Sequence, residues 1–300
     1  MQITKLEQMF QVLATRPQKR LVAAWAVNSH TIAAVNDAVE MGFVSGILVG
    51  DESMIKAECA QMGLDADKFT IVDAKTDIEA ANVSVDLINA GEGDFLMKGL
   101  LSTDRYMRAI LNKERGLMNG GAVLSHVTVA EPKTYHKLLI FGDVAIIPEP
   151  DLKQKIAICN YLIRTAHLLG IKEPKLGILG PSEQVLPKIK SSFEASILAK
   201  MAHRGQIKGA IVEGPLGMDL IIDKESARIK GVESSVCGDA DCILFPNLEA
   251  GNTFYKTVTT LCNSELCAIV MGAKVPCVLT SRGDSERSKL FSIALAAILA

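Results

Sequence analysis

The chain has 300 residues and a mass of 32.2 kDa, which exceeds the usual size of one domain and predicts two domains or one large α/β sheet. Its 32 basic and 34 acidic side chains give a net charge of −2, which excludes the strongly basic surface of a general nucleic-acid-binding protein. Hydrophobic residues make up 49% and aromatic residues only 5%, so the chain is globular and lacks the aromatic platforms on which bases stack.

We expect no targeting signal at the beginning of the chain. Residues 1–7 include polar and acidic side chains where a signal peptide would carry an apolar core. No run approaches ~18 uninterrupted apolar residues, the length needed to cross a membrane. We therefore expect a soluble, cytoplasmic protein with no membrane partner.

Short aliphatic runs alternate with longer amphipathic stretches along the chain. The aliphatic runs, apolar on both faces and bounded by Gly or Pro, predict strands at Leu21–Val27, Gly46–Val49, Phe69–Val72, Phe95–Lys98, Ala122–Leu124, Leu138–Ile147, Leu176–Leu179, Gly209–Val212, Cys242–Phe245, Ala268–Val270 and Cys277–Thr280. The amphipathic stretches predict helices at Thr31–Glu40, Glu52–Met62, Asp77–Asn89, Thr103–Asn112, Asp151–Gly170, Gln184–His203, Asn252–Ser264 and Glu286–Leu299. This alternation predicts an α/β fold with largely parallel sheets.

The helix predicted from Asp151 to Gly170 has the clearest end signals. Asp151 can cap the first turn with Gln154 at the reciprocal position, and Gly170 suits the left-handed residue that follows a helix.

One stretch departs from the alternation. The extended runs 122–129 and 135–147 are separated by only five residues, which predicts an antiparallel ribbon. The Gly-rich segment 116–121 just before them indicates a domain boundary.

Ligands of parallel sheets bind beyond the carboxyl ends of the strands, so the residues after each strand are candidate site residues. After the strand that ends at Lys98, Ser102 and Thr103 precede Arg105 and Arg108, a pattern that fits either a phosphate site or a capped helix with solvated arginines.

Two later strand ends are also polar. After Phe245 come Asn247, Glu249 and Asn252, which form either a ligand-binding turn or a cap at Asn252. After Thr280, the segment 281–285 places an arginine beside a glycine, so that backbone and guanidinium can both reach an anion, although its Asp and Ser can equally cap the last helix.

Several motifs are missing from the sequence. It contains no GxGxxG after the first strand, no GxxxxGK[ST] and no HExxH, and its five histidines have no ligand spacing. The seven cysteines include no CxxC pair, which predicts free thiols in a reducing compartment. We therefore expect no bound metal.

The segment Asp239–Asn252, followed by Tyr255 and Lys256, resembles a hallmark of the phosphate acetyl/butyryltransferase family. The segment Pro276–Ser285 before an Ala-rich last helix, the block Met97–Thr103 and the early Ile47–Asp51 are similar to the same family. The resemblance extends from about residue 20 to the C-terminus. The length of the chain and its Lys-Gly-Leu-Leu-Ser-Thr sequence resemble most the short butyryltransferase branch.

The resemblance implies two α/β domains with largely parallel sheets, similar to isocitrate and isopropylmalate dehydrogenases, with the site in the cleft between them. The first domain would comprise residues 1–118 plus 270–300, and the second residues 119–269. It further implies reversible transfer of a short acyl group, butyryl in this branch, between coenzyme A and inorganic phosphate. Coenzyme A is then a substrate, no cofactor is permanently bound, no metal is used, and the chain forms a homodimer or larger homo-oligomer.

The resemblance also assigns roles to residues. Arg282 would polarise the acyl phosphate, and Ser281 would orient the reacting groups and stabilise developing charge. Substrate binding would involve residues at the strand ends, namely Ser102, Thr103, Arg108, Asn247, Glu249 and Asn252.

One position departs from the family. The acetyltransferases carry an aspartate seven residues after the motif serine, proposed to deprotonate the thiol of coenzyme A, and here that position is Ser288. Asp284 and Glu286 are nearby substitutes, and we take Asp284 as the candidate base. Three alternatives therefore stay open: a phosphate acetyltransferase, a dehydrogenase on the same architecture, and a non-catalytic acyl-CoA-binding relative.

Overall fold

The computed structural model describes residues 1–280 and 285–300, which divide into two compact units. The terminal unit comprises Glu7–Leu124 and Cys267–Ala300, and the central unit comprises Met1–Leu6 and Ser125–Leu266. The sequence placed the boundaries at 118/119 and 269/270. The structure differs by a few residues, and it assigns Met1–Leu6 to the central unit because Ile3 donates its N–H to Leu169 and Leu6 donates its N–H to Glu131.

The terminal unit is a layered α/β structure. Its elements, in chain order, are α1 (Gln8–Leu13), β1 (Lys19–Ala24), α2 (Ser29–Glu40), β2 (Val44–Gly50), α3 (Glu52–Gln61), the 3-10 helix η1 (Ala66–Lys68), β3 (Thr70–Asp73), α4 (Asp77–Asn89), β4 (Phe95–Lys98), α5 (Thr103–Ile110), β10 (Glu265–Met271), β11 (Cys277–Val278) and α11 (Glu286–Leu299). The strand order is β3-β2-β1-β4-β11-β10. Every pair is parallel except β11 with β10.

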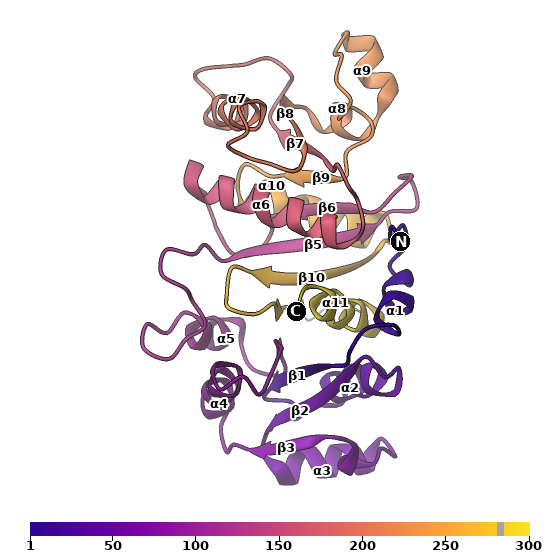
Figure 1. Cartoon of the computed structure of the whole chain (residues 1–300), viewed down its shortest axis with the longest axis vertical. Helices are drawn as coiled ribbons and strands as arrows, with labels where there is room; N and C mark the ends of the chain where they lie inside the picture. Colours follow the sequence, from indigo (N-terminus) through magenta and orange to yellow (C-terminus); the bar gives the residue numbers. More distant parts are fainter. Residues whose placement is uncertain (281–284) are drawn as a thin grey trace. The chain divides into compact units, whose positions relative to one another are not determined.

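Helices pack on these strands in two groups. α4 packs on α5, and α11 packs on α2 and α1. In Figure 1, α4 and α5 lie to the left of β1 and β2 and α2 lies to the right. Leu21–Ala24 of β1 are fully buried, as a strand covered on both faces should be. Almost every residue of α11 is buried, which explains why its sequence is apolar all round.

The central unit is also an α/β structure with a largely parallel sheet. Its elements are β5 (Ser125–Glu131), β6 (Leu139–Gly142), α6 (Leu152–Leu168), β7 (Lys175–Leu179), α7 (Lys190–His203), β8 (Ile211–Leu216), α8 (Met218–Ile222), α9 (Lys224–Lys230), β9 (Cys242–Leu244), α10 (Leu248–Lys256) and the π-helical turn η2 (Thr257–Leu261). The strand order is β5-β6-β9-β7-β8, and the pairs are parallel except the predicted antiparallel ribbon of β5 and β6, which is confirmed.

The ends of α6 also confirm the prediction. The Asp151 carboxylate accepts the N–H of Gln154 at 2.7 Å, and the Gln154 side chain accepts the N–H of Asp151 at 2.8 Å. Gly170, with φ +88°, follows the helix in the left-handed region.

Other predicted boundaries were wrong. α7 begins at Lys190 rather than near Gln184, because the segment before it contains Pro187 and is held by Ser192. Within the described residues, no helix is long and apolar enough to span a membrane.

Candidate active site

A pocket of about 180 Å³ lies in the terminal unit, at the carboxyl ends of the neighbouring parallel strands β1 and β4. This is the edge at which parallel sheets bind their ligands. Its lining comes from the turn after β1, the turn after β4 and the C-terminal segment, and consists of Asn28, His30, Thr31, Met97, Lys98, Gly99, Leu100, Leu101, Thr280 and Lys289.

The wall of this pocket depends on a close approach of two backbones. Gly99 donates its N–H to Ala24 at 2.8 Å, and Leu100 donates its N–H to Trp25 at 2.9 Å. A Cβ on Gly99 would lie 2.4 Å from the carbonyl oxygen of Trp25 and 2.6 Å from that of Ala24, so only glycine fits. Trp25 itself has φ +55°, a left-handed conformation that costs free energy and is typical of functional turns.

This geometry yields a prediction for Gly99→Ala. The new methyl group would push the β4 turn away from β1, so we expect the variant to lose about 1–3 kcal/mol of stability. Displacement of the pocket wall should also lower the catalytic rate roughly 100-fold. Urea denaturation and the activity assay described below check both effects.

Gly120→Ala is the matched control for Gly99→Ala. A Cβ on Gly120 meets nothing within 4 Å, and its φ is not left-handed, so this variant should behave like the wild type. Normal activity of Gly99→Ala would contradict the assignment of this turn to the site.

Among the described residues, the pocket lining presents cations and no carboxylate. The Lys98 ammonium donates to the carbonyl oxygens of Gly99 at 3.1 Å and Leu101 at 3.0 Å, which holds it at the mouth of the turn. Lys289 reaches the pocket from the first turns of α11, and Thr31 donates its hydroxyl to Asn28 at 2.6 Å. Two ammonium groups with nearby amide and hydroxyl groups can hold a phosphate.

The predicted residues of α5 lie beside this pocket but do not line it. Ser102 is the N-cap of α5 and accepts the N–H of Arg105 at 3.3 Å, and Thr103 is exposed in the first turn. Arg108 pairs with Asp104 at 2.9 Å and its side chain is 79% exposed. Arg105 pairs with Asp77.

Sequence reasoning gave Lys98 no role of its own, although Lys98 lies within the family-like block Met97–Thr103. The available signal was a lysine that ends an otherwise apolar strand and precedes a glycine. Ser281, Arg282 and Asp284, the predicted catalytic residues, lie outside the described residues, whereas Thr280 just before them lines the pocket.

The predicted residues of the central unit gather at the first turn of α10. Asn247 is its N-cap and accepts the N–H of Ala250 at 3.0 Å, so the alternative of a cap at Asn252 does not hold. The predicted helix start at Asn252 was wrong, because the helix begins four residues earlier, at Leu248. The Asn252 amide instead donates to the carbonyl oxygen of Val144 at 3.2 Å, and Glu249 is exposed. The structure thus brings these three residues together on one helix end.

Asp143, which sequence reasoning missed, holds the loop that receives Asn252. It follows β6 and is 2% exposed. One carboxylate oxygen accepts from the Ser125 hydroxyl at 3.0 Å and the His126 N–H at 3.1 Å. The other accepts the N–H groups of Ala145 at 2.7 Å and Ile146 at 2.8 Å. The signal was an aspartate directly after the buried run Leu139–Gly142, at the edge where ligands bind.

Gly251 completes this contact. A Cβ there would lie 2.2 Å from the carbonyl oxygen of Asp143, so the α10 turn and the loop after β6 touch through backbone atoms. The loop and the helix end form one rigid polar unit.

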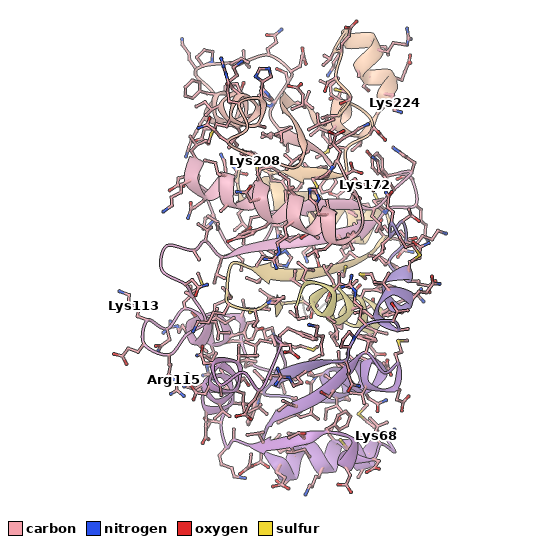
Figure 2. The ribbon with its side chains drawn as sticks, viewed as in Figure 1. Lys68, Lys113, Arg115, Lys172, Lys208 and Lys224 are labelled. Carbon is pink, nitrogen blue, oxygen red and sulfur yellow. The ribbon has the colours of Figure 1, made fainter. Side chains whose placement is uncertain are left out.

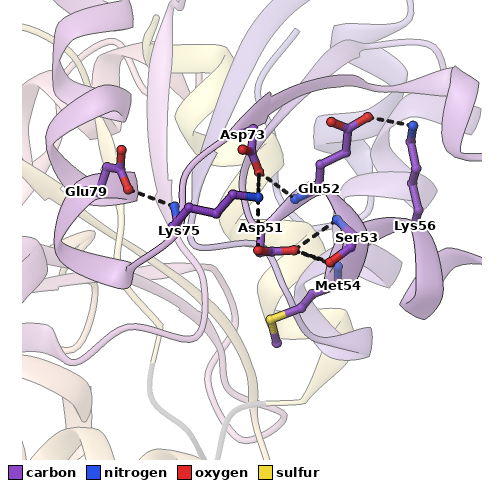
Figure 3. Close-up of polar contacts among 8 residues, drawn as sticks. All are labelled: Asp51, Glu52, Ser53, Met54, Lys56, Asp73, Lys75 and Glu79. Carbon is purple, nitrogen blue, oxygen red and sulfur yellow. Dashed lines mark hydrogen bonds and ion pairs between the residues drawn. The ribbon is translucent and has the colours of Figure 1, made fainter.

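A third polar cluster, after β2 and β3, has a structural role. Lys75 donates to Asp51 at 3.2 Å and to Asp73 at 2.8 Å (Figure 3). Asp51 caps α3 by accepting the N–H groups of Ser53 and Met54. The Ser53 hydroxyl at 2.5 Å, the Met54 N–H and the Lys75 ammonium lower the pKa of Asp51 to about 2.

The low pKa of Asp51 predicts a pH dependence. A carboxyl whose folded pKa is depressed stabilises the fold above its unfolded pKa of about 3.9, and that contribution disappears as pH falls through the folded value. We expect an NMR titration of the Asp51 carboxyl to show a midpoint near pH 2. Lys75→Met should raise this midpoint only in part, since Ser53 and Met54 remain. A midpoint near 4 in the wild type would contradict this account.

The described residues contain no metal-binding cluster, and two of their buried thiols are poorly reactive. Over residues 1–280 and 285–300, no group of three or more His, Cys, Asp or Glu side chains is placed to hold a metal ion. Burial raises the pKa of Cys159 and of Cys277 to about 12, which keeps these thiols protonated and poorly nucleophilic.

Comparison with known proteins identifies relatives over the whole chain. The family described as phosphate acetyl/butaryl transferase matches residues 78–297. The phosphate butyryltransferase of Clostridium acetobutylicum is 40% identical over 99% of both chains, and the phosphate acetyltransferase of Thermotoga maritima is 37% identical over 94% of this chain and 95% of the relative.

Two solved structures share the fold of this chain. A branched-chain phosphotransacylase from Enterococcus faecalis superposes with a TM-score of 0.82 at 26% identity, covering 94% of this chain and 99% of that one. A 4-hydroxythreonine-4-phosphate dehydrogenase from Klebsiella pneumoniae, at 12% identity and a TM-score of 0.57 over 93% of this chain and 98% of that one, shares the fold alone.

Proposed function

Because the chain belongs to the phosphate acetyl/butyryltransferase family, we propose that it transfers a short acyl group reversibly between coenzyme A and inorganic phosphate. The observation that carries this proposal is the pocket at the ends of β1 and β4, where Lys98 and Lys289 line a space suited to phosphate and no carboxylate occurs among the described lining residues. Coenzyme A is a substrate in this reaction and is released in each cycle.

The proposed chemistry is a direct transfer. The sulfur of coenzyme A attacks the carbonyl carbon of the acyl phosphate and forms the thioester bond, while the bond from carbon to phosphate oxygen breaks and phosphate leaves with its electron pair. The thiol proton passes to a base. In the reverse direction phosphate attacks the thioester. Electrostatic stabilisation of the oxyanion and of the leaving phosphate is the main demand on the protein.

We assign the roles in this chemistry as the family resemblance implies. Arg282 polarises the acyl phosphate and Ser281 orients the reacting groups. The resemblance further implies that Ser102, Thr103 and Arg108 of α5 contribute to substrate binding. From the pocket lining, and not from the resemblance, we add that Lys98 and Lys289 hold the phosphate.

The polar helix end of the central unit also belongs to this proposal. There Asn247, Glu249 and Asn252 contribute to substrate binding, and Asp143 positions Asn252 through the carbonyl of Val144.

We propose that the base for the thiol lies close to Ser288 in the sequence. Ser288 stands where the acetyltransferases have an aspartate, and it is buried, with its N–H donated to the Ser285 hydroxyl and its own hydroxyl accepting from Ser285, each at 3.1 Å. It therefore acts as part of the cap of α11, and we propose Asp284 as the base.

The acyl group is proposed to be butyryl. The identities do not separate four carbons from two, but the butyryltransferase relative matches end to end. We further propose an isocitrate dehydrogenase-like fold with two α/β units, a homodimer or larger homo-oligomer, and a cytoplasmic location, as the family implies.

The test is an assay of coenzyme A release. Purified protein is mixed with phosphate, a thiol reagent and acetyl-, propionyl-, butyryl- or isobutyryl-CoA. We expect release that requires phosphate and a kcat/KM that is highest for a four-carbon chain, since one methylene contributes about 1–3 kcal/mol of discrimination. Absence of phosphate-dependent release at every chain length would overturn the proposal.

The serine at position 288 also favours a second candidate, a non-catalytic acyl-CoA-binding protein. This candidate predicts that butyryl-CoA binds in a calorimetric titration while no coenzyme A is released. The same two measurements therefore separate the two functions.

A further inference from the structure

The central unit contains a larger cavity, of about 390 Å³, at the amino ends of its parallel strands β7 and β9. Lys175, which lines it, is the first residue of β7, and Asp239, also in the lining, precedes β9. The proposed substrate-binding residue Asn247 follows the other end of β9. The cavity therefore does not belong to the edge at which a parallel sheet binds its substrates.

Lys224 is one of the cations that line this cavity. Within the described residues, no carboxylate pairs with Lys224, the first residue of α9 (Figure 2). The backbone of Lys224 is held in place by Gly238, which has φ +64°. Gly238 packs so closely that a Cβ there would lie 2.3 Å from the backbone nitrogen of Lys224. The exposed ammonium is thus attached to a rigid wall.

The other charges around the cavity are largely compensated. Asp239 accepts from Lys175 at 2.5 Å, from His136 at 2.7 Å and lies 3.1 Å from the Lys137 ammonium. Although burial opposes it, these three partners hold the pKa of Asp239 well below its usual range.

The remaining lining side chains can take part in anion binding or oppose it. Glu225 occupies two donors of Arg228, at 2.7 and 2.5 Å, which leaves other guanidinium donors available. Ser235 adds an exposed hydroxyl. Among the described residues Glu233 is a lining carboxylate with no cation on it, so it would repel an anion.

We propose that this cavity is a second, non-catalytic binding site for a phosphate dianion, either free phosphate or the monoester of a small organic molecule, held by Lys224, Arg228 and the hydroxyl of Ser235. Charge-assisted hydrogen bonds from an ammonium and a guanidinium are the usual protein ligands of phosphate. Glu233 weakens the site and so sets its affinity. This proposal goes beyond acyl transfer, because none of these residues has a role in the chemistry.

Calorimetric titration of the full chain with inorganic phosphate, and separately with adenosine 5′-monophosphate, tests the site. We expect the wild type to show a binding class that Lys224→Gln weakens at least ten-fold and that Glu233→Gln strengthens several-fold. Both variants should keep the wild-type KM for phosphate in the coenzyme A release assay. Lys208→Gln, an exposed lysine of the same unit outside the cavity (Figure 2), is the matched control and should bind like the wild type.

The outcomes discriminate. If the Lys224-dependent site binds phosphate more tightly than adenosine 5′-monophosphate, its ligand is free phosphate. If it binds the nucleotide more tightly, its ligand is a phosphate monoester. Titrations of the wild type and Lys224→Gln that superimpose for both probes would overturn the proposal. A wild type without acyl-transfer activity would refute the proposed function but leave this binding class, and its dependence on Lys224, intact.

Discussion

Asp143→Ala is expected to lose about 3–5 kcal/mol of unfolding free energy, as is typical when one partner of a buried charged interaction is removed. Four donors would be left without their acceptor: the Ser125 hydroxyl and the N–H groups of His126, Ala145 and Ile146. Asp143→Asn should lose less, because one carbonyl oxygen remains, but its NH₂ group would face two donors. Urea denaturation measures both losses.

Asp143 variants should also impair catalysis under conditions in which they are still folded. The loop after β6 presents the Val144 carbonyl to Asn252. Displacement of this loop should therefore raise the KM for at least one of the substrates under conditions in which the far-ultraviolet circular dichroism is still that of the folded protein. Asp151→Asn is the control, since asparagine caps a helix about as well as aspartate. Stability of Asp143→Ala within 1 kcal/mol of the wild type would contradict the role of this carboxylate.

Arg282→Ala is expected to lower kcat/KM for phosphate-dependent coenzyme A release by about 10²–10³-fold, the range found when a donor to a developing oxyanion is removed. A guanidinium presents a fork that matches two phosphate oxygens, so Arg282→Lys should restore charge without restoring the geometry and should recover only part of the rate.

The control for Arg282→Ala is Arg287→Ala in the same segment. The Arg287 guanidinium pairs with Glu7 and lies 5.3 Å from the centre of the Phe291 ring, and Arg287 is not among the described residues that line the pocket. Its loss should leave kcat/KM nearly unchanged. Near-normal rates for Arg282→Ala would remove this residue from the mechanism.

Local signals were sufficient where a feature depends on neighbours in sequence. The cap of α6 could be predicted because Asp151, Gln154 and Gly170 lie at fixed spacings from the helix ends. The antiparallel ribbon of β5 and β6 followed from two extended runs with a short turn. At α10 the same reasoning had two asparagines to choose from, and only the tertiary contact of Asn252 with Val144 decides that Asn247 is the cap.

Features that depend on distant contacts could not be predicted. The partners of Asp143 include the first two residues of β5, 17 and 18 positions earlier, and an apolar pattern does not report which hydroxyl or N–H will face a carboxylate. Likewise the need for glycine at position 99 arises from Ala24 and Trp25, at the end of β1 and more than 70 residues before it. The family motif indicated that Lys98–Leu101 matters, and the structure supplies the reason.

The left-handed turn at the end of β1 has a practical consequence. Trp25 is the single tryptophan of the chain, and its carbonyl accepts from Leu100 in the wall of the pocket at the ends of β1 and β4. Its fluorescence is therefore a label-free signal that belongs to the terminal unit alone, while the central unit contains no indole. Ligand entry into that pocket can be followed by Trp25 emission, and the same emission during denaturation separates the melting of one unit from that of the other.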